Sequence, residues 1–208
     1  MHLLLTDRLS CPRCGPGFGL ILLAERLIDR RVHDGVLGCP NCRDSFTVTD
    51  GFADLREPPR GPLAPGLAGP GGGDPAEGQR VVALLGIPRG PGTVALVGGA
   101  ARHAGLLVDT VPELDAVVVD PDTRAWAEHP GVSRIVSAPG LPFFSGMLRG
   151  VVVDGRLGEA MIFEAARVTA PRCRTVVVSA PEGAQRVLEE AGLDILAAEA
   201  GTVVAARG

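Results

Sequence analysis

Four cysteines arranged as two CxxC pairs place the strongest constraint on how the first part of this chain can fold. The pairs are Cys11-Pro-Arg-Cys14 and Cys39-Pro-Asn-Cys42, with 24 residues between them. Each pair can curl so that both sulfur atoms face one point, and two such pairs form a tetrahedral cage for zinc. A cage closed by four thiolates leaves no coordination position for a substrate. We therefore predict that Cys11, Cys14, Cys39 and Cys42 bind a structural zinc ion.

Other chemistry of the same cysteines stays open at this point. Iron in a rubredoxin-like site uses the same four ligands, and the sequence does not distinguish it from zinc. Disulfide bonds would need an oxidising compartment, which the N-terminus does not support, and a redox pair would need only one CxxC motif. We expect the metal to hold together a ribbon too small to fold alone. Residues 19–38 predict two strands, or a strand and a turn, and residues 45–55 predict another short strand.

Composition and charge argue against several classes of protein. The net charge of −4 gives no indication of a nucleic-acid partner. No apolar run approaches the ~20 residues that a membrane-spanning helix needs. The first apolar run is three leucines long and is soon followed by Asp7 and Arg8, which is not the pattern of a signal peptide. We therefore expect a cytoplasmic protein without a membrane span, with a core built from Val, Leu and Ala.

The chain divides into three segments by composition. Residues 1–56 hold four of the five cysteines, and we predict that they form the zinc ribbon. Residues 57–75 are rich in Pro and Gly with almost no pattern, which is typical of a linker. Residues 76–208 alternate short Val-rich runs with helix-like stretches, which predicts an α/β domain.

The Val-rich runs of the third segment are apolar throughout instead of alternating, as in parallel strands covered on both faces. The predicted strands are 93–97, 115–120, 132–136, 150–154, 174–180, 194–200 and 202–207. The predicted helices are 76–86, 101–111, 122–128, 157–169 and 182–191. Only Gly201 separates the last two strands, so we expect an antiparallel hairpin at the edge of the sheet.

A pair of glycines follows the first strand of this domain. Free N–H groups at such a turn, where a helix begins, can bind an anion or a ribose. Asp120 ends the next strand, 22 residues after Gly98, and suits the binding of ribose hydroxyls. A role in a strand-end turn suits it equally, and Asp122 can cap the helix that follows. We predict Gly98, Gly99 and Asp120 as the cofactor-binding residues.

The N-terminal segment resembles a known family. The stretches LTDRLSCPRC and GVLGCPNCRDSFTVTDGFADLR resemble the small zinc-ribbon proteins that activate methyltransferases, and the ribbons fused ahead of some bacterial methyltransferases. The resemblance covers residues 1–56. It implies that the ribbon can bind a protein partner.

Residues 76–207 resemble a class I S-adenosylmethionine-dependent methyltransferase domain. TVALVGG is similar to the first motif of that family and VVVDPD to the second, while GLPFFSGMLRGVVVDG and FEAARVTAPRCRTVVVSAP resemble later conserved stretches. The resemblance implies a Rossmann-like fold with a mostly parallel seven-stranded sheet and a C-terminal antiparallel hairpin. It also implies S-adenosylmethionine as the cofactor.

The segment departs from that family at the residues that would contact the cofactor. Leu96 stands where the family has an acid, and Ala100 and Arg102 replace two glycines of the loop. Further departures are Ser137, Arg149, Arg172 and Cys173. An alanine hinders close approach of the backbone to a ligand.

Side chains beside the glycine turn leave two roles open. Arg102 and His103 can meet an acidic ligand or form a solvated surface pair. Asp154 can be a general base or, as we favour, a helix cap, and no catalytic constellation stands out.

Two functions follow. The chain is a methyltransferase of unknown substrate in which Gly98, Gly99 and Asp120 contact the cofactor. Alternatively it is a catalytically inactive relative that serves as a binding or scaffolding module.

Overall fold

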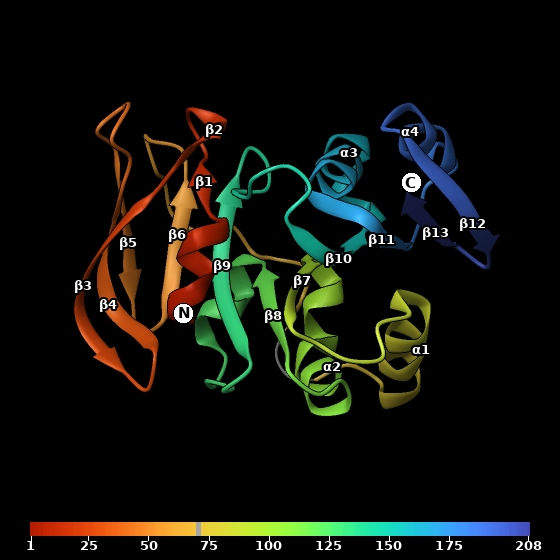
Figure 1. Cartoon of the computed structure of the whole chain (residues 1–208), viewed down its shortest axis with the longest axis horizontal. Coiled ribbons are helices and arrows are strands. Elements are labelled where there is room, and N and C mark those ends of the chain that lie inside the picture. Colours follow the sequence, from red (N-terminus) through yellow and green to blue (C-terminus); the bar gives the residue numbers. More distant parts are fainter. Residues whose placement is uncertain (70–71) are drawn as a thin grey trace.

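The computed structural model describes residues 1–69 and 72–208, and most of its strands join one sheet (Figure 1). This sheet has 11 strands in the order β12-β13-β11-β10-β7-β8-β9-β6-β5-β4-β3, and β1 and β2 form a separate antiparallel pair. The cysteine-containing segment supplies the end with β3, and the C-terminal hairpin supplies the end with β12.

The strands are short and most of them are rich in Val or Leu. Their bounds are β1 Ser10–Cys11, β2 Gly15–Gly19, β3 Ile21–Ile28, β4 Arg31–Gly38, β5 Ser45–Thr49, β6 Phe52–Arg56, β7 Gly92–Val97, β8 Leu114–Val119, β9 Val132–Ala138, β10 Leu148–Asp154, β11 Thr169–Val178, β12 Leu193–Glu199 and β13 Thr202–Arg207.

Helices cover both faces of the sheet (Figure 1). The α-helices are α1 Pro75–Leu85, α2 Ala104–Thr110, α3 Glu159–Val168 and α4 Ala184–Glu190, and the 3-10 helices are η1 Leu3–Arg8, η2 Gly98–His103, η3 Pro121–Ala125 and η4 Gly155–Leu157. Residues of α3, α4 and η1 share one apolar cluster with the sheet, and residues of α1 and α2 share another. Successive residues of β7 alternate between them, since Ala95 and Val97 belong to the first cluster and Val94 and Leu96 to the second.

Strands β7 to β13 form the predicted α/β sheet. Strands β9, β8, β7, β10 and β11 are parallel neighbours, and β13 pairs antiparallel with both β11 and β12. The seven-stranded arrangement with a C-terminal antiparallel hairpin is therefore confirmed.

The helix predicted at 122–128 is wrong, because the structure has only the 3-10 turn η3 there. The Arg134 guanidinium donates to the carbonyl oxygens of Thr123, Arg124 and Trp126. The Thr123 carbonyl would accept an intrahelical bond if an α-helix continued here. The buried Arg134 of β9 therefore binds carbonyl oxygens that would otherwise accept hydrogen bonds within that helix.

The single short strand predicted at 45–55 is also wrong, because this stretch is the hairpin β5–β6. Its turn is Asp50-Gly51, with φ of +48° and +74°. An Asp-Gly pair with both φ values positive is a favoured two-residue hairpin turn, since its twist matches that of the flanking strands. For residues 19–38, the structure has two strands, β3 and β4, and thus the first of the two predicted alternatives.

Strand β6 joins the cysteine-containing segment to the α/β sheet. It pairs in parallel with β9, in register from Phe52 opposite Arg134 to Arg56 opposite Ala138. The six strands β6, β9, β8, β7, β10 and β11 are therefore all parallel, and their carboxyl ends lie at the same edge of the sheet. We call it the carboxyl edge below.

Within residues 1–69 and 72–208, no helix is long and apolar enough to cross a lipid bilayer.

The joint between β6 and β9 makes a testable contribution to stability. Leu55 of β6 is fully buried, whereas Leu23 of β3 is 67% exposed. We expect Leu55→Ala to lower the free energy of unfolding by about 2–5 kcal/mol, since it leaves a cavity beneath the joint. Leu23→Ala is the matched control and should change it by less than ~0.5 kcal/mol. Urea unfolding followed by circular dichroism measures both. Equal effects of the two variants would contradict a core that continues through β6.

Candidate functional site

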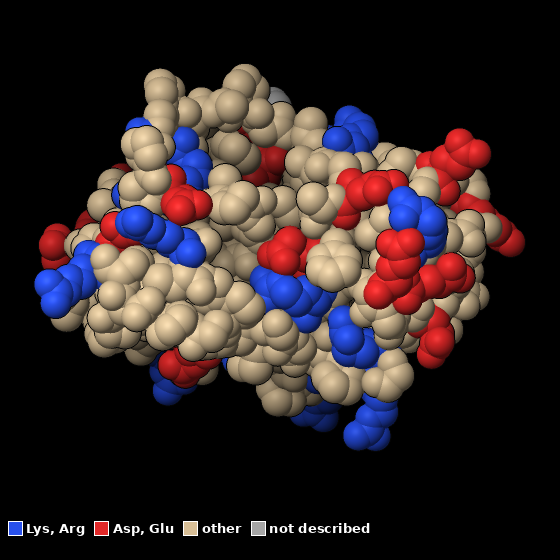
Figure 2. Space-filling view, turned by 90° about the horizontal axis from the view of Figure 1, so that it is seen from above, with Lys and Arg blue, Asp and Glu red and all other residues tan. Residues whose placement is uncertain are grey.

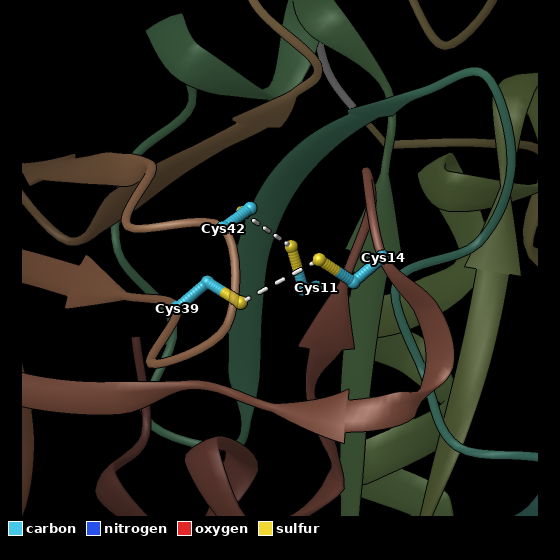
Figure 3. A group of neighbouring side chains, drawn as sticks. All are labelled: Cys11, Cys14, Cys39 and Cys42. Atoms are coloured by element: carbon cyan, nitrogen blue, oxygen red, sulfur yellow. Dashed lines mark hydrogen bonds between the residues drawn. The ribbon is translucent and has the colours of Figure 1, made fainter.

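The four cysteines predicted as metal ligands lie together (Figure 3). Cys11 and Cys14 come from β1 and the turn after it, and Cys39 and Cys42 come from the connection between β4 and β5. The four Sγ atoms all lie within 4.8 Å of one another. The Sγ atoms of Cys11 and Cys42 are 3.7 Å apart, and those of Cys14 and Cys39 are 3.8 Å apart.

These distances suit a metal cage. A tetrahedron with Zn–S bonds of about 2.3 Å places its sulfur atoms about 3.8 Å apart. A disulfide would need about 2.05 Å, and all five cysteines are free. The four thiols can therefore hold a metal ion. Cys173 lies in β11 outside this group, and burial raises the pKa of its thiol, which favours an unreactive side chain.

Backbone N–H groups of each CxxC turn point at the first sulfur of their own turn. Those of Arg13 and Cys14 lower the pKa of Cys11 against the larger opposing effect of burial. Burial also raises the pKa of Cys39, but the N–H groups of its own turn and neighbouring thiols bring it down to about 7. The two turns are tied by an ion pair of 3.0 Å between Arg13 and Asp44. The N–H groups of both turns thus act toward the thiolate form that a metal ion needs, but burial keeps the pKa of Cys11 above its usual value and raises the pKa of Cys42 to about 12.

The predicted cofactor residues lie at the carboxyl edge of the sheet. Gly98 follows β7, Asp120 follows β8, and Asp154 ends β10, which pairs with β7 on its other side. Gly98 has φ of +67°, where an added Cβ would lie 2.8 Å from the Leu157 side chain. The turn therefore needs glycine at this position. Topology brings together the residues that were predicted from strand ends.

Asp154 fills the space beside the glycine turn. Its carboxylate is 1% exposed, accepts a hydrogen bond of 3.0 Å from the Arg156 N–H, and pairs with the Arg156 guanidinium. Burial raises the pKa of Asp154, but the hydrogen bonds from Arg156 and the Gly99 N–H outweigh burial and place it below the usual value. The contact with the Arg156 N–H is the helix cap that we favoured.

Asp120 is 3% exposed, and both of its carboxylate oxygens are engaged. Oδ1 accepts from the Asp122 N–H at 2.9 Å, which is the strand-end turn role that the sequence left open. Oδ2 accepts from the Leu67 N–H at 2.8 Å. Leu67 belongs to the Pro/Gly-rich segment, of which we call residues 61–69 the strap.

Sequence reasoning missed the strap as part of this site. Besides the contact with Asp120, its Gly66 and Gly69 N–H groups donate to the two carboxylate oxygens of Asp122. These are backbone donors, so no side chain in the segment marks them. The only signal is the high glycine content, which is equally typical of a linker.

Two of the residues that depart from the methyltransferase pattern, Leu96 and Arg102, have structural roles here. Leu96 is fully buried in the apolar cluster beneath α1 and α2, and not in the space beside Gly98. Arg102 donates to the Gly99 carbonyl at 2.9 Å and to the Leu67 carbonyl at 3.1 Å. His103 is 4% exposed, so the reading of Arg102 and His103 as a solvated surface pair is wrong.

A hollow of about 680 Å³ lies where the predicted helix 122–128 is missing. The starts of α1 and α2 and the segment after η3 line it, with Trp126 and His103 among the lining residues. The Trp126 Nε1–H donates to the Gly69 carbonyl, and the His103 Nε2 atom lies 3.5 Å from the Glu77 carboxylate.

Figure 2 shows the molecule from above the view of Figure 1. Acidic and basic side chains are interspersed over this face, and acidic ones gather over the end that carries α3, α4 and β12. Among the described residues on this face, basic side chains do not form the continuous stripe typical of a surface that binds nucleic acid.

The chain matches no family model and none of the curated proteins searched. It does match solved structures. A geranyl diphosphate methyltransferase in complex with SAM aligns with a TM-score of 0.51 at 10% identity, over 64% of this chain and 85% of that one. A complex that contains the Haloferax volcanii Trm112 methyltransferase activator aligns with a TM-score of 0.45 at 16% identity, over 57% of this chain and 68% of that one.

Similarity at such low sequence identity shows the fold alone. The assignment of the fold rests on the match to the geranyl diphosphate methyltransferase. The chain has the Rossmann-like α/β fold of class I methyltransferases, as the resemblance of residues 76–207 implied.

The carboxylate beside the glycine turn predicts a pH dependence of stability. The folded pKa of Asp154 lies below its unfolded value of about 3.9, so its contribution is present above that pH and is lost as pH falls through the folded pKa. We expect Asp154→Asn to lower the free energy of unfolding by about 1–2 kcal/mol at about pH 7 and pH 5, and by less at about pH 3.5.

Urea unfolding at these three pH values measures this difference. Glu182→Gln, at an exposed position in the same part of the chain, is the control and should change little at any pH. A deficit of Asp154→Asn that is constant down to about pH 3.5 would show that the charge of Asp154 is not the cause.

Proposed function

We propose that this chain is a SAM-dependent methyltransferase, of a substrate not yet assigned, with a structural zinc ion in its N-terminal ribbon. The observation that carries the proposal is the meeting of three features at one edge of a methyltransferase fold. These are the left-handed Gly98 turn after β7, Asp120 after β8 and Asp154 at the end of β10. Ligands of open α/β sheets bind outside the carboxyl ends of the strands, where the strand order reverses, and here it reverses between β7 and β10.

The residues of this edge fit the cofactor in part. Asp120 would hold ribose hydroxyls. The turn at Gly98 and Gly99 has no Cβ atoms, but the side chains of Leu157 and Asp154 lie against it, so these would have to move for a ligand to approach its backbone. When bound, the cofactor would supply an electrophilic methyl group. The chain's own contribution is to position that ligand, and positioning alone accounts for a large part of many methyl transfers.

A non-catalytic binding module is the second candidate function. It is favoured by the strap, which occupies the Asp120 carboxylate, and by Leu96 and Ala100 in place of the family's acid and glycine. In that case the fold would keep the shape of the enzyme without its cofactor.

For the metal, we propose zinc at the four cysteines of a ribbon formed by residues 1–56, followed by a linker at 57–75 and the methyltransferase-like part at 76–208. The fit of the sulfur distances to a ZnS4 tetrahedron supports zinc. Four free thiols at these distances also favour a reducing compartment, in agreement with the expected cytoplasmic location.

The metal site predicts a clear difference between cysteine variants. Elemental analysis of the purified protein should find about one zinc per chain, and Cys14→Ser or Cys42→Ser should lose most of it, since three thiolates close the tetrahedron poorly. Cys173→Ser is the matched control, because Cys173 is also half-buried but lies outside the cluster, and it should keep the metal. Iron in place of zinc would support the four-cysteine site but contradict the assignment of zinc to it. No bound metal in protein prepared without chelator would contradict the site.

The cofactor site predicts binding of SAM in the micromolar range, measured by isothermal titration calorimetry. Asp120→Ala should weaken it by about tenfold or more, because the ribose loses its acceptor. Asp115→Ala, at the amino end of the same strand, is the control and should bind as the wild type does. No heat of binding at millimolar SAM would contradict the enzyme and favour the non-catalytic module.

A further inference from the structure

Backbone N–H groups of the strap donate hydrogen bonds to the carboxylates that follow β8. The Leu67 N–H lies 2.8 Å from Asp120 Oδ2, and the Gly66 and Gly69 N–H groups lie 2.9 and 3.1 Å from the two oxygens of Asp122. Hydrogen bonds to a carboxylate are about twice as strong as those between neutral groups. Three such hydrogen bonds, from Gly66, Leu67 and Gly69, hold the backbone of the strap on the two aspartates.

The carbonyl groups of the strap are also bound. The Leu67 carbonyl accepts from Arg102, which at the same time donates to the Gly99 carbonyl of the glycine turn. The Gly69 carbonyl accepts from the Trp126 indole at 3.0 Å. Ala68 is 3% exposed and belongs to the apolar cluster beneath α1 and α2. The strap is therefore packed into the edge and does not lie loosely over it.

Glycine at position 66 makes this close approach possible. A Cβ added to Gly66 would lie 1.8 Å from Asp120 Oδ1, well inside van der Waals contact. Any other residue at this position would force the strap away from Asp120. The backbone at Gly66 and Leu67 thus occupies the space in front of the carboxylate into which a ligand hydroxyl would have to fit.

We propose that the strap is an internal competitor of the methyl-donor cofactor, so that the ribose of the cofactor and the Leu67 N–H exclude each other at Asp120. This inference rests on the proposed function, which assigns Asp120 to the ribose. The protein then has a closed form, with the strap on Asp120, and an open form that binds the cofactor. The observed affinity is the affinity of the open form reduced by the fraction of molecules that are open.

A single methyl group tests the competition. Gly66→Ala places its Cβ against Asp120 and should displace the strap, so we expect SAM affinity to rise by about tenfold or more over the wild type. Gly61→Ala is the matched control. It makes the same change in the same segment, at a position where the added Cβ would meet no other residue's atom within 4 Å. It should bind SAM as the wild type does. Calorimetry on the full chain measures all three.

Trp126 reports the position of the strap independently of affinity. It is the only tryptophan and the chain has no tyrosine, so the intrinsic emission comes from this one side chain. Release of the strap removes the hydrogen bond from the indole to Gly69 and admits water. We expect a red-shifted emission in Gly66→Ala but not in Gly61→Ala, and the same red shift in the wild type when SAM is added.

The outcomes separate this inference from the proposed function. A red shift in Gly66→Ala together with wild-type affinity overturns the competition and leaves the cofactor site intact. A red shift with no SAM binding by any of the proteins overturns the cofactor site, and the competition with it. An unshifted emission in folded Gly66→Ala shows that the strap is not held against Asp120 as described, which also overturns the inference.

A second variant covers the case in which Gly66→Ala does not fold. Asp122→Asn keeps the size of the side chain but presents an NH2 group to one of the two strap donors, so it should loosen the strap while leaving Asp120 unchanged. It should give the same red shift and a smaller gain in SAM affinity than Gly66→Ala. Wild-type emission and affinity in a folded Asp122→Asn would count against the competition.

Discussion

The common direction of six neighbouring strands governs the rest of this structure. Because β6 runs parallel to β9, and β9 to β8 and β7, Arg56 leaves the sheet at the edge where the glycine turn and Asp120 lie. The next element, α1, has to begin near the same edge in order to return the chain to the start of β7. The segment between them therefore has to run along the carboxyl edge past β9 and β8. The strap lies on Asp120 because the topology leads it there.

Much of this fold can be predicted from sequence, for identifiable reasons. Strands covered on both faces are apolar throughout, so the Val-rich runs of β7, β8 and β10 are visible without a structure. The CxxC spacing indicates the four clustered cysteines in the same direct way. The predicted helix at 122–128 failed because its carbonyls are bound by Arg134, a contact that local propensity does not contain. The hairpin at Asp50-Gly51 has a recognisable turn signal, but the β-rich residues on both sides of it also fit one continuous strand.

The candidate site was predictable only where it depends on strand ends. Asp120 and Asp154 end apolar runs, and parallel strands bring such positions together. What binds Asp120 could not be predicted, since the donors are backbone N–H groups of a segment without periodicity. The decisive residue there is Gly66, which matters through the absence of a side chain. Sequence patterns describe side chains well, and they describe contacts made by bare backbone poorly.

The β6–β9 pairing also has a consequence for biosynthesis. Phe52 lies opposite Arg134, which is 134 − 52 = 82 residues later in the chain. At roughly 5–20 residues per second, the ribosome makes β9 on the order of ten seconds after β6. All four clustered cysteines precede β6, so this part of the chain is made before β9. During that interval the nascent chain exposes an unpaired strand edge, and closure of this long loop will be among the slower steps of folding.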